Sequence, residues 1–96
     1  MSYELMGKII DVKGECDAGH KVGEEIDLNL FNEDGTVKGL KLCPYFMDNI
    51  FPYLCVMQFG GQLPWEKDPN ISVASCPDWE NMVKIRIERI LVGKQE

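Results

Sequence analysis

Several features that would assign a small protein to a familiar class are missing from this 96-residue chain. Its first residues contain neither the basic nor the apolar stretch of a secretory signal, and no uninterrupted apolar run is long enough to span a bilayer. Lys and Arg total 10 against 16 Asp and Glu, a formal net charge of −6. Because binding to nucleic acid and to anionic membranes depends on excess positive charge, neither is an expected partner. The sequence predicts a soluble, cytoplasmic protein.

Catalytic motifs are also scarce. There is no G-x-S-x-G elbow, and Gly60-Gly61 lacks the following Lys-Ser/Thr of a phosphate-binding loop. His20 is the only histidine, so any site that needs two imidazoles is excluded. The four cysteines include no C-x-x-C pair, the usual unit of structural zinc modules. A functional site must therefore be assembled by the tertiary fold from residues that are distant in sequence.

Length and composition predict a single domain over residues 1–96, with one modest core. In a reducing compartment, four cysteines are expected to be thiols, metal ligands or catalytic groups rather than a disulfide framework. The acidic residues between positions 24 and 34 are interpreted as a solvated face and loop. They are Glu24, Glu25, Asp27, Glu33 and Asp34.

The stretch 42–61 carries the strongest helical pattern. One apolar stripe recurs with helical spacing and consists of Phe46, Ile50, Tyr53, Leu54 and Met57. A second stripe consists of Phe51, Cys55 and Phe59. Pro44 is suited to the first helical position and Gly60-Gly61 to the end, while Pro52 predicts a kink or a division into two short helices. Because both faces are apolar and the chain is small, the sequence predicts a homodimer.

About five short strands are expected around this helix, at residues 5–12, 26–30, 36–40, 71–75 and 83–92. Turn residues at 32–35 predict a hairpin between the second and third strands. Residues 62–70 are expected to cross the surface, anchored by Trp65. The apolar alternation of the last strand changes phase near Arg89, which predicts a bulge or a twist there. The predicted fold is α+β, with mainly antiparallel strands packed around one kinked central helix.

Three loops contain the residues with the most distinctive chemistry. Proline follows cysteine at Cys43-Pro44 and Cys76-Pro77, and a following proline holds the cysteine backbone extended. Cys16 and His20 share a third loop. Three thiolates and one imidazole are a suitable ligand set for zinc or for another soft transition metal, such as cuprous copper or iron. The predicted metal site is therefore Cys16, His20, Cys43 and Cys76.

Other functions fit the same residues. The three thiols could carry out redox chemistry instead of binding a metal. Cys43, at a helix N-terminus that favours its thiolate, could be the nucleophile of a thiol-dependent enzyme with His20 as its base. The chain could also be a non-catalytic interaction module whose cysteines are incidental. Cys55, between Phe51 and Phe59, is expected to be a small buried hydrophobe with no chemical role.

Four sequence blocks resemble those of a family of short bacterial and archaeal proteins whose function is uncharacterised. The blocks are C-D-A-G-H-K-V-G at 16–23, L-C-P at 42–44, F-G-G-Q-L-P-W at 59–65 and S-C-P-D at 75–78. The resemblance covers nearly the whole chain but implies no particular activity, cofactor or partner. It implies that Cys16, His20, Cys43 and Cys76 belong to the family pattern, whereas Cys55 does not.

Overall fold

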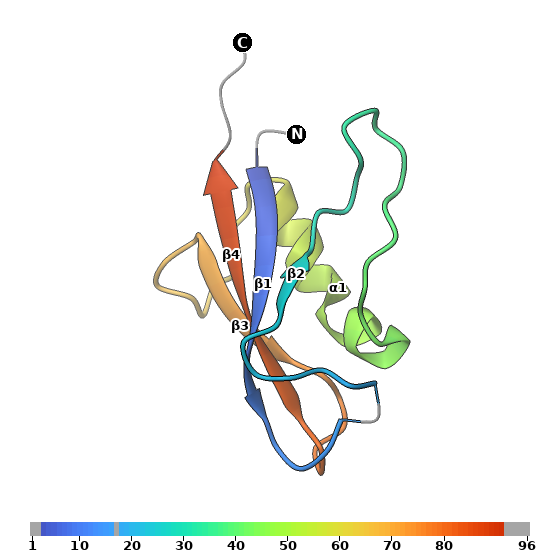
Figure 1. Ribbon diagram of the computed structural model, residues 1–96. Coiled ribbons are helices and arrows are strands. Elements are labelled where there is room, and N and C mark those ends of the chain that lie inside the picture. Colours follow the sequence, from blue (N-terminus) through green and yellow to red (C-terminus); the bar gives the residue numbers. More distant parts are fainter. Residues whose placement is uncertain (1–2, 17, 92–96) are drawn as a thin grey trace.

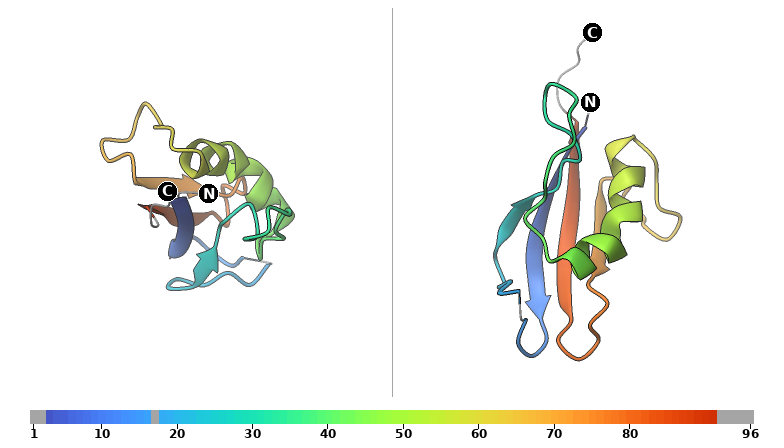
Figure 2. Two further views of the ribbon diagram at one scale, coloured as in Figure 1. Left: turned by 90° about the horizontal axis from the view of Figure 1, so that it is seen from above. Right: turned by 90° about the vertical axis from the view of Figure 1, so that its right-hand side faces the viewer.

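The computed structural model describes residues 3–16 and 18–91, which form one four-stranded sheet and one helix. The elements follow in the order β1 (Tyr3–Val12), β2 (Glu25–Asp27), α1 (Pro44–Gln58), β3 (Ile71–Ser75) and β4 (Val83–Leu91). All neighbouring strands are antiparallel, in the spatial order β2-β1-β4-β3. The helix packs on one face of the sheet, against β1 and β3 (Figures 1 and 2). The predicted α+β class is confirmed.

The core lies between the helix and this face of the sheet. Strand β4 alternates strictly, with Val83, Ile85 and Ile87 buried and Lys84 and Arg86 exposed, as expected for a sheet covered on one side. The buried face of α1 consists of Phe46, Ile50, Leu54 and Met57, together with Gln58. The first predicted stripe is therefore confirmed, except that Tyr53 is only half-buried.

Helix α1 begins and ends where the sequence predicts. Pro44 occupies its first turn, and the left-handed Gly60 (φ 85°) follows its C-terminus. The helix continues through Pro52, so a division into two helices was wrong. In Figure 2 its first turns lie at an angle to its last, the bend expected at an internal proline. Among residues 3–16 and 18–91, no helix has the length and apolar character needed to cross a membrane.

The second predicted stripe is more exposed than the first. Phe51 is 44% exposed and Phe59 is 63% exposed, and Cys55 between them is half-buried. The expected burial of Cys55 is therefore confirmed only in part: the side chain packs against the core but is not fully covered. The homodimer stays a prediction: light scattering coupled to size exclusion should give twice the mass of 10.9 kDa. A monomer at micromolar concentration would contradict it.

The predicted hairpin is much reduced. Residues 36–40 form no strand, and only an isolated bridge joins Phe31 to Val37, so the sheet has four strands rather than five. The second predicted strand ends at Asp27, because the side chain of Asn29 replaces the backbone as a partner for β1. Its Oδ1 accepts a hydrogen bond of 2.9 Å from the N–H of Leu5. A side-chain acceptor of this kind competes with the strand ladder.

The predicted bulge near Arg89 was also wrong. Strand β4 pairs with β1 without interruption through Arg89, and the extra residue of the pair is Ile10, on β1. Arg89 lies on the buried face of β4, two residues after Ile87, and is only 6% exposed. Its guanidinium donates hydrogen bonds to the carbonyls of Met57 (3.1 Å) and Gly61 (2.7 Å). A charged residue can occupy a core position here because these acceptors satisfy it.

Candidate functional site

Three loops meet beside the lower part of the sheet in Figure 1, on the side where α1 begins. They are residues 13–24 between β1 and β2, residues 41–43 before α1, and residues 76–82 between β3 and β4. Hydrogen bonds join the first and third loops. Lys13 donates from its N–H to the carbonyl of Met82 (2.8 Å) and from Nζ to the carbonyl of Trp79 (3.2 Å), and the N–H of Glu15 donates to Oδ1 of Asn81 (3.1 Å). The antiparallel pairing of β1 and β4 thus fixes these two loops side by side.

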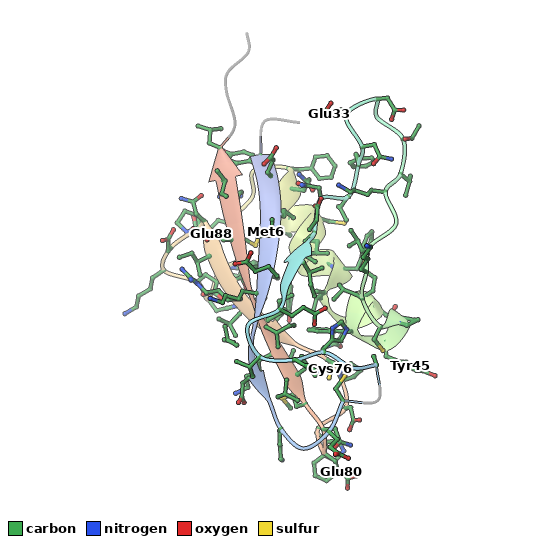
Figure 3. All side chains as sticks on the ribbon, in the orientation of Figure 1. Met6, Glu33, Tyr45, Cys76, Glu80 and Glu88 are labelled. Carbon is green, nitrogen blue, oxygen red and sulfur yellow. The ribbon has the colours of Figure 1, made fainter. Side chains whose placement is uncertain are left out.

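A pocket of about 430 Å³ lies among the three loops. All four residues predicted for the metal site line it, namely Cys16, His20, Cys43 and Cys76. Phe46 and Val83 supply part of an apolar wall, and Tyr45 lies at the same end of the molecule, where Figure 3 labels it with Cys76. Cys55 lies farther along α1 and is not among the lining residues. The structure therefore gathers the four predicted residues around a single cavity.

A tight turn shapes the first loop. The N–H of Gly19 donates a hydrogen bond of 2.9 Å to the carbonyl of Cys16, and Gly19 adopts the left-handed conformation (φ 85°) that glycine takes without strain. Because the chain folds back over these few residues, Cys16 and His20 reach the same pocket from one loop.

His20 is held on three sides and is only 8% exposed. Its Nδ1 lies 2.9 Å from Oε1 of Glu24, and its Nε2 accepts a hydrogen bond of 3.4 Å from the N–H of Cys43. The ring meets Phe46 in an edge-to-face contact, with 5.7 Å between centroids. The imidazole is therefore oriented by a carboxylate, a backbone N–H and an aromatic ring.

Cys43 occupies the N-cap position of α1, as the sequence predicts. Its backbone angles (φ −53°, ψ 136°) are the extended ones favoured before proline, and its carbonyl accepts the N–H of Met47 at 2.9 Å. Its side chain makes no capping hydrogen bond. The half-buried thiol therefore does not cap the helix, and Cys43 lines the pocket.

Cys76 is fixed at the base of the β3-β4 hairpin. Its N–H donates to the carbonyl of Val83 (3.0 Å), and its Sγ accepts a hydrogen bond from the N–H of Val83 (3.2 Å). Asp78 shapes the loop by accepting hydrogen bonds from the N–H groups of Glu80 and Asn81, both at 3.2 Å. A backbone N–H directed at sulfur is available to a thiolate as a charge-assisted hydrogen bond.

The four residues surround the pocket without forming a finished coordination sphere. Within residues 3–16 and 18–91, no three Cys, His, Asp or Glu side chains form a group that could hold a metal ion. All four cysteines are free thiols. Ligand atoms at the walls of one cavity would have to move inward before they could bind a common ion.

The proposed pairing of Cys43 with His20 takes an unexpected form. The contact of 3.4 Å joins the imidazole to the backbone N–H of Cys43 and not to its thiol. A general base has to reach the proton that it removes, and here its Nε2 accepts from the backbone instead. The thiol-enzyme hypothesis stays a prediction without a thiol–imidazole hydrogen bond to support it.

Glu24 is the site residue that sequence reasoning missed. It was assigned to a solvated acidic face, yet its carboxylate is a direct partner of His20 and is 38% exposed. The available signal was its position, four residues after the only histidine and in the same loop. Its position near the only histidine of the chain is a stronger indication of a functional role than its place in a run of acidic residues.

The chain matches no family model, no curated protein and no solved structure. The resemblance of the four sequence blocks to an uncharacterised family therefore stays a prediction. What defines the protein is an α+β fold whose sheet and helix bring three thiols and one imidazole to one pocket.

Proposed function

We propose that the protein binds one soft transition metal ion, with zinc the best fit, through Cys16, His20, Cys43 and Cys76. The observation that carries the proposal is that these four residues, spread over most of the sequence, line the same pocket. Three thiolates and one imidazole make a complete tetrahedral zinc set. A cytoplasmic location, where thiols stay reduced, is part of the proposal.

Metal binding would draw the loops together. Each cysteine sulfur changes position by rotation about χ1 between staggered rotamers, and all three cysteines are half-buried in loops or at an element end. The Cys43 thiol has no capping hydrogen bond to give up. Because the ligands converge only when the ion is present, binding free energy would also stabilise the folded state.

Thiol redox chemistry is the second candidate, and the gathering of three thiols in one pocket supports it equally. The hydrogen bond between His20 and Glu24 favours the metal, because histidines that bind metals commonly donate their other ring N–H to a carboxylate. A dithiol–disulfide couple has no need for such an oriented imidazole. Metal binding therefore accounts for more of the observed contacts.

Elemental analysis of untagged protein, purified without chelator, tests the proposal. Wild-type protein and the matched control Cys55→Ser, which alters a thiol outside the pocket, should each contain about one zinc per chain. Cys76→Ser should lose most of it. Wild-type protein that holds no metal and takes up no added zinc would refute the proposal. A disulfide between two pocket cysteines in that protein would favour the redox alternative.

A further inference from the structure

We infer that Glu24 is a positioning residue that presents Nε2 of His20 to the bound metal. The inference rests on the proposed function, because it assigns the atom through which His20 binds. It also makes a claim about the metal-free protein, namely that Glu24 selects one tautomer of the imidazole. That claim can be tested separately from metal binding.

The tautomer follows from the contacts of the ring. An ionised carboxylate can only accept hydrogen bonds, so the 2.9 Å contact between Nδ1 and Oε1 of Glu24 places the proton of a neutral ring on Nδ1. The lone pair is then on Nε2. The N–H of Cys43 points at this same Nε2, and a donor there requires an acceptor. Two independent contacts therefore assign the same tautomer.

The second contact is weak enough to be replaced by a metal. At 3.4 Å, the hydrogen bond from the N–H of Cys43 to Nε2 lies beyond the usual range for N–H donors. Nε2 is thus directed toward the residue that supplies one of the proposed thiolate ligands. A small movement of the ring would exchange the backbone donor for an ion shared with Cys43.

The backbone of Glu24 is firmly placed. Its carbonyl accepts a hydrogen bond of 2.9 Å from the N–H of Ile9, and the N–H of Gly23 donates to the carbonyl of Ile9 at 2.8 Å. These bonds attach the end of the first loop to β1. The carboxylate also accepts a longer bond of 3.4 Å from the N–H of Lys21. Glu24 therefore orients His20 from the end of a loop that backbone hydrogen bonds attach to β1, as a supporting residue should.

Long-range proton–nitrogen NMR spectra of the imidazole test the first half of the inference. Because His20 is the only histidine, its two ring nitrogens give the only such signals. At alkaline pH, where an imidazole is neutral, metal-free wild-type protein should show the Nδ1–H tautomer. Glu24→Ala should shift the ring toward the Nε2–H form. Glu24→Gln, whose amide oxygen still accepts a hydrogen bond, should keep the wild-type tautomer.

Zinc affinity, measured by competition with a chromophoric chelator, tests the second half. Glu24→Ala should weaken binding about 10- to 100-fold, the usual effect of removing such a partner. Glu24→Gln should bind zinc more tightly than Glu24→Ala and more weakly than wild type. Glu25→Ala, an exposed neighbour on β2, is the matched control and should bind like wild type.

The outcomes separate the inference from the proposed function. An unchanged tautomer in Glu24→Ala, or an altered tautomer with unchanged zinc affinity, would overturn the role of Glu24. Wild-type protein that binds no zinc would overturn the proposed function. In that case a tautomer shift in Glu24→Ala would still establish that Glu24 orients His20.

Discussion

Replacing Arg89 with methionine is expected to lower the free energy of unfolding by about 2–4 kcal/mol, because the change removes three charge-assisted hydrogen bonds made by a buried guanidinium. The guanidinium donates to the carbonyls of Met57 and Gly61 and, through Nε, to Oδ1 of Asn70 at 3.2 Å. It also lies 4.6 Å from the centroid of the Tyr3 ring. Methionine keeps an apolar stem of similar length but replaces none of these donors.

The position of these acceptors explains why the effect should be large. Met57 lies in the last turn of α1, where the carbonyls carry partial negative charge and a cation is favoured, and Gly61 follows just beyond the helix. Arg89 therefore attaches the end of the helix to β4 through the interior of the protein. Loss of the side chain should loosen α1 against the sheet as well as lower stability.

Urea unfolding curves of the metal-free protein measure the effect. Arg86→Met is the matched control, since Arg86 lies on the same strand but on its exposed face, and it should change stability by less than about 0.5 kcal/mol. Arg89→Lys should fall between the two, because an ammonium cannot reproduce the geometry of the guanidinium. Equal stability of Arg89→Met and Arg86→Met would mean that the buried hydrogen bonds contribute nothing net.

Arg89 also shows where sequence reasoning about the fold reached its limit. The alternation of β4 is regular through Ile87, and the next inward position is Arg89. A charged residue at an inward position is rare without partners, so a shift of phase was the natural interpretation. Its partners come from residues 57, 61 and 70, which only the tertiary fold brings together. Local periodicity cannot detect such compensation.

The remaining elements were predictable to the extent that they depend on local patterns. Helix α1 has a proline at its start, glycines after its end and a full apolar stripe, and all three signals were correct. The hairpin failed because its second strand had only weak apolar patterning, and Val37 is 81% exposed. Asn29 then ended β2 through its side chain, a contact with Leu5 that is remote in sequence.

The four residues predicted for the candidate site line one pocket, but the geometry of that pocket could not be predicted from the sequence. Cysteine followed by proline at positions 43 and 76, and a cysteine and a histidine in one loop, indicated residues that the structure places around the same pocket. Their separations depend on how β1 and β4 hold the loops, which no residue pattern encodes. Glu24 was missed for a related reason, since the carboxylate gains its role only when the loop folds back on β1.

Zinc is expected to raise the stability of the protein substantially, since an ion that binds only the folded chain shifts the folding equilibrium toward it. At a free zinc concentration 100 times the dissociation constant, the gain is about 2.7 kcal/mol. For a domain of this size, that corresponds to a rise in the unfolding temperature of roughly 10–20 °C. The rise should depend on zinc concentration and should be reversed by a chelator.

The set of residues that zinc stabilises is a sharper test of metal binding than the size of the increase in stability. Hydrogen exchange measured by mass spectrometry should show zinc protecting the three loops at 13–24, 41–43 and 76–82, because each contains at least one of the proposed ligands. Cys55→Ser should gain as much stability and the same protection as wild type, whereas Cys16→Ser should gain little of either. An unfolding temperature that zinc leaves unchanged would contradict metal binding. Protection confined to one loop would instead mean that the three loops do not share an ion, because a common ion has to order all of them together.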